Sequence, residues 1–208
     1  MPVLRRYTNL AAAIHLLQTK NITLLNPATW DDTNDAYFMA EYKRYKKAKS
    51  VLALCFTMQS ETYHHWHVFS NGSDGVCIDF EKDTLLPTFG SGPTIRLGLV
   101  RYRKIKELTA SKSIDVETLP FLKRLPYEDE REFRVVYVSK SSAVEFKDYP
   151  VKVAWIRRIT LSPWMSRALA ASVRDNLRAI EGCARLKISR STLVDNETWK
   201  SCTANVQA

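Results

Sequence analysis

The sequence predicts a single α+β domain in which helices flank a central mixed, mostly antiparallel sheet. The chain has 208 residues, enough for one substantial hydrophobic core. Its composition is globular, since 45% of the residues are hydrophobic and 11% are aromatic. Strand and helix patterns follow one another irregularly, without a repeat or a linker, which favours α+β over regular βαβ units. We expect the domain to span residues 1–195 and a frayed C-terminal tail to span 196–208.

The first half of the chain has apolar patterns that predict four strands and three helices. The strands are expected at 3–7, 22–25, 51–57 and 76–80, and the helices at 10–19, 36–47 and 60–69. Asn9 precedes the first helix and is of a residue type that favours the N-cap position. The run at 51–57 is continuously apolar, which is typical of a central strand buried on both faces.

The second half of the chain predicts five more strands and two more helices. The strands are expected at 95–102, 130–138, 143–146 and 153–161, with an edge strand at 185–188, and the helices at 116–124 and 164–180. Pro126 should stop the first of these helices, while Pro163 and Gly182 mark the start and the end of the second. The most apolar runs, at 51–57, 76–80 and 133–138, are expected to be inner strands.

The stretch 129–137, Asp-Glu-Arg-Glu-Phe-Arg-Val-Val-Tyr, combines charged residues with the apolar run of a strand that enters a core. If it is extended from Glu130 onward, the alternation of a strand places Glu130, Glu132 and Arg134 on one face. Two carboxylates about 7 Å apart beside a guanidinium form a compact polar group. Such a group can bind a metal, hold a ribose hydroxyl or form an ion-pair ladder on the surface.

The charge of the chain favours a polyanionic partner. The formal net charge is +9, and a nucleic acid is the simplest partner that would neutralise it. Basic clusters at 42–49 and 101–106 both contain tyrosine, which suits phosphate contact together with base stacking. The expected nucleic-acid contacts are Lys43, Arg44, Lys46, Lys47, Arg101, Arg103 and Lys104. The competing interpretations are that the charge serves solubility and that the first cluster stabilises a helix C-terminus.

Other broad classes are disfavoured. No apolar run approaches the roughly 20 residues needed to span a bilayer, and the N-terminus lacks the pattern of a secretory signal. The four cysteines lie far apart without a C-x-x-C pair, so they indicate neither a zinc site nor a disulfide framework. We therefore expect a cytoplasmic protein with no membrane partner. A protein partner and the oligomeric state are left open.

A series of short motifs runs along most of the chain. It comprises Arg6-Tyr7, Pro27-x-x-Trp30-x-Asp32-x-x-Asp35, Cys55-Phe56-Thr57, Trp66 with Phe69, Gly75-Val76-Cys77-Ile78-Asp79-Phe80 and Glu130-x-Glu132-Phe133-Arg134. Together these motifs resemble the bacterial and phage family named domain of unknown function twenty-nine seventy-one, from Arg6 to about Ser191. Thr33 and Phe69 depart from the family, in which proline and tyrosine are common at these places. The family name implies no reaction.

The order of the motifs is also similar to the layout of ADP-ribosyltransferases, in which an early strand with a polar residue precedes a late strand with a glutamate. This resemblance implies an ADP-ribosyltransferase-like fold, NAD as a substrate and a nucleic-acid target, in a toxin or defence protein of phage or bacterial conflict. Cleavage of the nicotinamide bond of NAD needs a carboxylate near the ribose, a cation for the pyrophosphate and an aromatic surface for the ring. The expected catalytic residues are Glu132 and Glu130, and the expected cofactor-binding residues are Arg6, Arg134, Tyr7, Tyr63 and Trp66.

Two further functions are compatible with the sequence. A metal-dependent nuclease would hold Mg²⁺ through Asp31, Asp32, Asp35, Glu130 and Glu132. We expect no metal at His64, His65 and His67, because the three side chains do not converge from one helix. A non-enzymatic module that binds nucleic acid or inhibits a partner would use the basic clusters alone. In either enzyme the carboxylates would line a pocket, whereas in the non-enzymatic module they would lie on an open surface.

Overall fold

A large sheet organises the computed structural model, which describes residues 2–70 and 72–205. Within these residues the sheet has nine strands, and its main path runs β11-β10-β4-β1-β3-β2-β9. Strand β8 pairs with β3 and carries β5 on its other edge. Neighbouring strands of this sheet are antiparallel except β10 and β11, which are parallel. The prediction of an α+β domain with a mixed, mostly antiparallel sheet is confirmed.

The elements have the following bounds. The strands of the large sheet are β1 Val3–Asn9, β2 Asn21–Leu25, β3 Ser50–Thr57, β4 Gly75–Glu81, β5 Ile95–Leu99, β8 Glu132–Ser139, β9 Phe146–Pro150, β10 Ile156–Leu161 and β11 Ile188–Arg190. A small parallel sheet joins β6 Arg101–Arg103 to β7 Leu122–Arg124. The helices are α1 Leu10–Thr19, α2 Thr33–Tyr45, α3 Tyr63–Phe69, α4 Lys82–Leu85, α5 Ile105–Thr109, α6 Arg167–Ala179 and α7 Glu197–Ser201. Short 3₁₀ segments are η1 Pro27–Thr29, η2 Gly72–Asp74, η3 Leu86–Phe89, η4 Val116–Phe121, η5 Leu125–Glu130, η6 Val153–Trp155 and η7 Cys202–Asn205.

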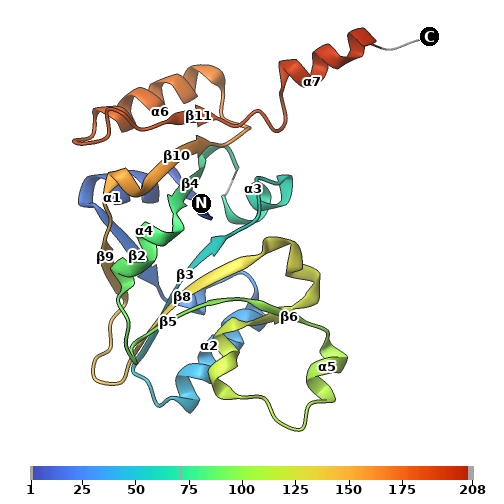
Figure 1. The fold of residues 1–208 in the computed structure, drawn as a ribbon. Helices are drawn as coiled ribbons and strands as arrows, with labels where there is room; N and C mark the ends of the chain where they lie inside the picture. Colours follow the sequence, from blue (N-terminus) through green and yellow to red (C-terminus); the bar gives the residue numbers. More distant parts are fainter. Residues whose placement is uncertain (1, 71, 206–208) are drawn as a thin grey trace.

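The two faces of the sheet are covered by different helices. Alternation along β3 sends Leu52, Leu54 and Phe56 into the larger core, which also contains apolar residues of α1 and α6. Val51 and Ala53 point to the opposite face, where they pack against α2 and η4 in a second core. Figure 1 shows α1 and α6 in the upper part of the molecule and α2 below β8 and β5. The candidate site lies on the face that carries α2.

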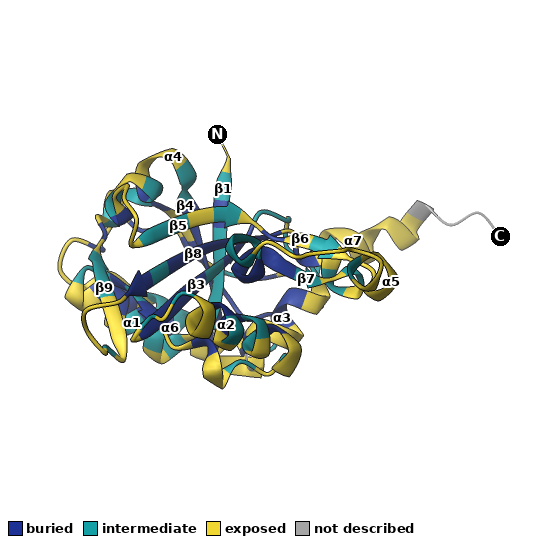
Figure 2. Cartoon of the chain, turned by 90° about the horizontal axis from the view of Figure 1, so that it is seen from below, coloured by how far each residue is buried: buried dark blue, intermediate teal, exposed yellow. Residues whose placement is uncertain are grey.

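The three strands expected to be inner all have a neighbour on each side. Strand β3 lies between β8 and the pair β1 and β2, β4 lies between β1 and β10, and β8 lies between β3 and β5. Figure 2 shows β8 and β3 in the colour of buried residues, whereas β5 at the edge is mostly half-buried or exposed. Their mostly apolar sequences, in which Asp79 and Arg134 are buried exceptions, reflect burial on both faces. This part of the fold prediction is confirmed.

Several predicted elements are wrong in type or position. The helix expected at 116–124 is instead η4 followed by β7, because Pro120 cannot donate a backbone hydrogen bond and residues 122–124 pair with β6. The strand expected at 95–102 is interrupted at Val100, and its two parts join different sheets. The predicted strand at 143–146 is replaced by β9, which pairs with β2.

Other boundaries shift by a few residues. The long C-terminal helix begins at Arg167 with Ser166 as its N-cap, so Pro163 lies before it rather than in its first turn. Strand β10 begins only at Ile156, after η6, and the edge strand lies at 188–190. Thr62 rather than Ser60 caps α3. Such shifts arise because caps and turns compete closely at element ends.

The C-terminal residues include more helix than the sequence indicated. Within the expected tail at 196–208, α7 and η7 are helical up to Asn205, and residues 206–208 lie outside the described part. Figure 1 shows α7 projecting from the rest of the chain. The domain boundary at residue 195 stays a prediction. Across the described ranges, no helix has the length and apolar character to cross a membrane.

Candidate active site

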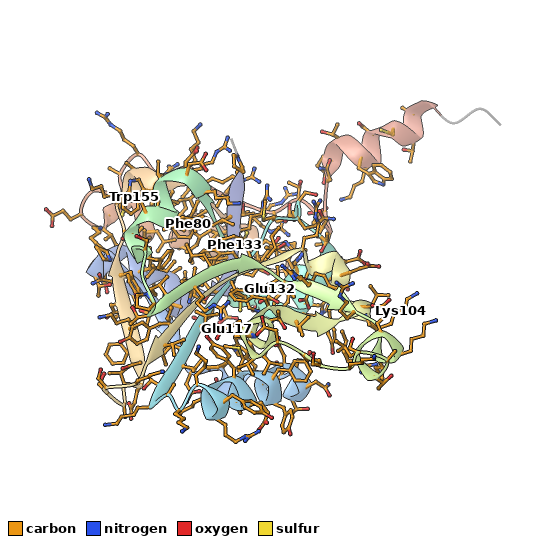
Figure 3. All side chains as sticks on the ribbon, turned by 60° about the horizontal axis from the view of Figure 1, so that its bottom comes forward. Phe80, Lys104, Glu117, Glu132, Phe133 and Trp155 are labelled. Carbon is orange, nitrogen blue, oxygen red and sulfur yellow. The ribbon has the colours of Figure 1, made fainter. Side chains whose placement is uncertain are left out.

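The register of four strands brings polar side chains together on the face of the sheet that carries α2. Glu132 on β8 lies opposite Thr57 on β3, and Thr57 lies opposite Arg5 on β1. Arg5 in turn lies opposite Asp79 on β4. Alternation then places Arg134 two residues from Glu132, on the same face. A band of polar residues therefore crosses four neighbouring strands, and Figure 3 shows Glu132 near the middle of the molecule.

Arg134 is the centre of a buried ion-pair network. Its side chain is fully buried, and Nε and Nη2 donate to the two oxygens of Glu132 at 2.6 and 2.8 Å. Nη1 donates to Asp35 Oδ1 at 2.8 Å and to the Pro120 carbonyl at 3.0 Å, and Nη2 also contacts Asp35 Oδ2. The ring of Trp30 covers the guanidinium. All five N–H donors of Arg134 are therefore used inside the protein.

Lys123 on β7 adds a second cation and a third carboxylate to this network. Its Nζ lies 2.6 Å from Glu130 Oε2, 3.5 Å from Glu132 Oε2 and 3.7 Å from Asp35 Oδ2. The network thus joins α2, β7, η5 and β8 through buried charges. Breaking one partner of such a group leaves another charge buried without compensation.

The protein shifts the pKa values of Glu132 and Glu130 in opposite directions. Burial disfavours the charge of Glu132, but the Arg134 guanidinium and the Lys123 ammonium outweigh it and lower the pKa of Glu132 to about 2. Burial raises the pKa of Glu130 to about 7, although Lys123 acts against the shift. Glu132 is therefore a permanent carboxylate, whereas Glu130 exchanges a proton near neutral pH.

A cavity of about 70 Å³ opens beside this network. It is lined by Arg5, Tyr7, Cys55, Phe56, Thr57, Phe69, Glu130 and Glu132. Among the described residues, four buried side-chain atoms make no hydrogen bond, and they are Arg5 Nε, Tyr7 OH, His65 Nε2 and Glu130 Oε1. Three of them belong to the cavity lining, and the fourth belongs to a ring stacked on Tyr7. Buried polar groups are nearly always paired, so this concentration indicates a binding site for a polar ligand.

Aromatic rings form one side of the cavity. The rings of Tyr7 and His65 are stacked, with centroids 5.3 Å apart and planes 12° apart. Phe69 lies 6.0 Å from His65 on α3, and Trp66 packs edge-on against Tyr7. Tyr7 and Phe69 thus present aromatic surface to the cavity.

Only some of the predicted site residues meet at this place. Glu130, Glu132 and Tyr7 all line the cavity. Arg134, predicted to bind the cofactor, gives all its donors to groups of the protein, and that role stays a prediction. Trp66 is fully buried and donates from Nε1 to Glu61, so it offers no free face to a ligand.

Arg6 and Tyr63 lie elsewhere. Arg6 is on the opposite face of β1 from Arg5, in a separate pocket, and its Nη1 donates to the Thr23 carbonyl at 3.4 Å. Burial lowers the pKa of Arg6 to about 10. Tyr63 is exposed and packs against His67 and Trp164. The structure therefore does not bring Arg6 or Tyr63 to the two glutamates.

Several residues of the site had little or no signal in the sequence. Arg5 is the cation that faces the cavity; its Nη1 donates to the Gln59 carbonyl at 2.8 Å, and Nε lies 3.6 Å from Asp79. Arg5 and Arg6 lie on opposite faces of β1, and the sequence alone does not show which of these faces carries the site. Lys123 lies in a segment expected to be helical, and His65 is not among the predicted site residues.

The acids of the nuclease hypothesis divide into two groups. Asp35, Glu130 and Glu132 share the network with Lys123 and Arg134. Asp32 instead caps α2 through its side chain, and Asp31 is exposed. In the described part of the chain, no three His, Cys, Asp or Glu side chains are grouped as metal ligands would be. The five acids therefore do not form one set of ligands.

The two basic clusters differ in their distance from the cavity. The Tyr102 hydroxyl, between Arg101 and Arg103, accepts a hydrogen bond from the Glu132 backbone at 2.9 Å. Asp35 lies in the first turn of α2 and Lys46 just beyond its end, which separates the two by roughly 16 Å along the helix axis. Lys46 is also paired with Glu117 at 2.5 Å, and Arg44 with Glu41 at 2.6 Å. The cluster at 101–104 is therefore the one next to the site.

The low pKa of Glu132 predicts a specific dependence of stability on pH. Its pKa is about 2 in the folded protein against an ordinary value of 4.5, so its contribution is complete above about pH 4.5 and disappears as the pH falls toward 2. We expect Glu132→Gln to lower the free energy of unfolding by about 3 kcal/mol at pH 7, and the difference from wild type to shrink toward pH 2. Urea titrations of both proteins from pH 2 to 8 measure this. A difference that does not change with pH would contradict the assignment.

Comparisons with known proteins leave the family open. No family model matches the chain, and no curated protein matches it by sequence, so the resemblance to domain of unknown function twenty-nine seventy-one is not confirmed. Similar solved structures include DarT of Thermus sp. 2.9 in complex with carba-NAD⁺ and with NAD⁺, each at 11% identity, a TM-score of 0.46 and coverage of 91% of this chain and 95% of that chain. A third is the same protein with ADP-ribosylated ssDNA, at 11% identity and a TM-score of 0.47, covering 91% of this chain and 94% of that chain. With TM-scores below 0.5, this likeness is too distant to assign an activity.

Proposed function

We propose that this protein is an NAD-consuming, ADP-ribosyltransferase-like enzyme that modifies a nucleic-acid target. The observation that supports the proposal is that one aromatic-walled cavity brings together a carboxylate oxygen of Glu130 and the Tyr7 hydroxyl, neither of which makes a hydrogen bond, with Arg5, whose Nε makes no hydrogen bond and lies 3.6 Å from Asp79. A carboxylate, a cation and an aromatic surface are the three groups that cleavage of the nicotinamide bond requires. All three are supplied here by the chain's own residues.

The proposed roles follow from the geometry. NAD supplies an ADP-ribosyl group whose bond to nicotinamide breaks with positive charge developing on the ribose. Glu130 Oε1 would stabilise that charge from within the cavity, where water is largely excluded. Arg5 would neutralise a phosphate oxygen, in the role that the sequence suggested for Arg6. Tyr7 and Phe69 would cover the ring.

The size of the cavity limits what it can hold. At about 70 Å³ it has room for a sugar edge or part of a ring, since one water takes roughly 30 Å³. A bound dinucleotide would therefore place only its reacting end inside and extend the remainder over the surface. Glu130, with a pKa of about 7, is suited to accept the proton released by the attacking group of the target. Glu132 would act as a positioning residue through Arg134 and Lys123.

The surface beside the cavity favours a nucleic-acid target. Arg101, Arg103 and Lys104 are exposed and flank Tyr102, which contacts the backbone of Glu132. Cations at this place can hold a phosphate backbone close to the reacting group. A role in phage or bacterial conflict stays a prediction.

The test of the proposal is an assay of NAD consumption and of mass addition to DNA, RNA and protein with the purified chain, together with NAD titration by calorimetry. Turnover of NAD with mass addition to a nucleic acid is the expected result. If NAD is neither bound nor consumed, the enzyme proposal fails. The basic cluster beside the site would then favour the second candidate, a non-enzymatic nucleic-acid-binding module.

Nucleic-acid binding should weaken steeply with salt. Each phosphate neutralised contributes a slope of about −0.9 for a duplex or −0.7 for a single strand in log K against log salt. We expect Arg101→Ala with Lys104→Ala to reduce the slope by about one such increment per lost contact. Lys43→Ala with Lys47→Ala, at the distant cluster, should change it less. Fluorescence anisotropy at salt concentrations from roughly 50 to 200 mM checks this. A wild-type affinity that does not change over this range would contradict an electrostatic interface.

A further inference from the structure

A second pocket lies on the opposite face of β1 from the candidate active site. Its volume is about 340 Å³, near the lower end of the range for small-molecule sites, and residues of α1, β1, β2 and β4 line it. None of its ten lining residues is acidic, and half of them are apolar, namely Ala11, Ala12, Leu16, Leu25 and Ile78. Arg6 supplies a guanidinium to this cavity, which we call the Arg6 pocket.

Arg6 has few partners within the protein. A guanidinium carries five N–H donors, and in the described part of the chain Arg6 uses one of them, from Nη1 to the Thr23 carbonyl at 3.4 Å. That distance exceeds the roughly 2.7–3.2 Å of an ordinary N–H···O bond. Among the same residues Arg6 makes no ion pair, whereas Arg5 lies 3.6 Å from Asp79 and Arg134 is bonded to two carboxylates. Most donors of Arg6 are therefore open to a ligand.

The charge of Arg6 is not balanced by a carboxylate of the described residues. The side chain is half-buried, and the loss of hydration lowers the pKa of Arg6 to about 10, with Cys55 acting against the shift. Burial raises the pKa of Cys55, so its thiol carries no charge at pH 7, whereas the guanidinium is still charged. Charges that proteins bury are paired as a rule, so Arg6 is suited to bind an anion from outside the chain.

Thr8 adds a second donor to the pocket. It lies two residues from Arg6 on β1, so the alternation of the strand places it on the same face, and it lines the same cavity. Its hydroxyl can donate to an anion that Arg6 holds. The hydroxyl of Thr23 cannot do so in the same way, because it already donates to Asp148 at 2.6 Å. The donors of the pocket are therefore concentrated on β1.

We propose that the Arg6 pocket is a second ligand site, which takes a small organic anion consisting of a carboxylate on a short aliphatic chain. Arg6 would bind the carboxylate through its planar fork, and the chain would lie against Ala12, Leu16 and Ile78. The apolar walls favour such a ligand over inorganic phosphate, which has no apolar surface to bury. This inference does not depend on NAD binding at the other face of β1.

Two substitutions test the two halves of the site separately. Arg6→Met keeps the bulk of the side chain and removes the charge. Because that charge has no partner, we expect this variant to fold and to be at least as stable as wild type. Ala12→Leu keeps the charge and fills the pocket from α1, where leucine is a good helix former. Arg185→Met is the matched control, since Arg185 is exposed and does not line the pocket.

The experiment titrates the ¹⁵N-labelled protein with acetate, butyrate, hexanoate, hexylammonium and inorganic phosphate, and follows the amide NMR signals. We expect the signals of β1 and α1 around the pocket to shift with hexanoate. Affinity should rise about fourfold for each methylene that is buried, so hexanoate should bind about tenfold more tightly than butyrate. Arg6→Met should weaken hexanoate binding roughly tenfold to a hundredfold, and Ala12→Leu about tenfold, while Arg185→Met should match wild type.

Three results would overturn the proposal. Equal affinity for acetate and hexanoate, or tighter binding of phosphate, would show an exposed cation that takes any anion. Unchanged hexanoate affinity in both Arg6→Met and Ala12→Leu, or equal binding of hexylammonium, would show that the pocket is not the site. Displacement of hexanoate by NAD would make the pocket part of the NAD site. If the wild-type protein binds hexanoate but not NAD, the proposed enzyme function fails and this inference stands.

Discussion

Replacing Arg134 with methionine should lower the free energy of unfolding by about 3–5 kcal/mol, enough to unfold much of the protein at 37 °C. The side chain is fully buried and gives all five donors to Glu132, Asp35 and the Pro120 carbonyl. Methionine fills similar volume but leaves two buried carboxylates without that partner. Lys123 can compensate only part of their charge, from 3.5 Å and 3.7 Å.

The conservative change Arg134→Lys should also be strongly destabilising, because an ammonium cannot reproduce the planar fork that meets two carboxylates at once. Arg101→Met is the matched control, since Arg101 is exposed. Urea denaturation followed by circular dichroism measures all three variants. If Arg134→Met stays within about 1 kcal/mol of wild type, the buried network does not stabilise the fold as described.

The sequence predicted the architecture well where burial leaves a clear pattern. Strands β3, β4 and β8 consist mostly of apolar residues, and Asn9 caps α1 as expected, because its side chain accepts from the backbone of Ala12. Residues 116–124 do not form the predicted helix, because Pro120 cannot donate a backbone hydrogen bond and residues 122–124 pair with β6. The position of β6 relative to this segment is a long-range contact, which the local sequence does not reveal.

The candidate site was predicted in part, since its charges were identified but not their partners. The sequence predicts a strand from Glu130 onward, yet Arg131 has a left-handed backbone with φ of 43° and β8 begins at Glu132. Glu130 nevertheless reaches the same face, because Lys123 holds its carboxylate. This contact joins segments that are separate in the chain, and the periodicity of one segment contains no information about it. The same holds for Asp35, whose contact with Arg134 spans 99 residues.

Glu130→Gln should abolish NAD turnover while leaving the protein folded, with a loss on the order of a hundredfold or more. The glutamine amide would keep an oxygen for Lys123, whose charge is also compensated by Glu132 and Asp35. The substitution removes the charge of the one cavity carboxylate, among the described residues, that has an unpaired oxygen. In wild type, the pKa of about 7 predicts that turnover rises with pH through neutrality, as the carboxylate forms.

Stability should change in the opposite direction to activity. The folded-state pKa of Glu130 lies above its ordinary value of 4.5, so this group weakens the wild-type fold progressively as the pH rises from about 4.5 to 7. Glutamine lacks that cost, and we expect Glu130→Gln to be more stable than wild type at pH 8, by up to about 3 kcal/mol, and nearly equal to it at pH 4. Thermal melts at both pH values and NAD turnover measure the two effects, with the exposed Glu128→Gln as the control.

A variant that keeps its activity, or that is less stable than wild type at pH 8, would show that Glu130 is a structural ion-pair partner of Lys123. A more stable but inactive variant is the expected result, because a carboxylate kept in an unfavourable environment lowers stability and is retained where catalysis needs it.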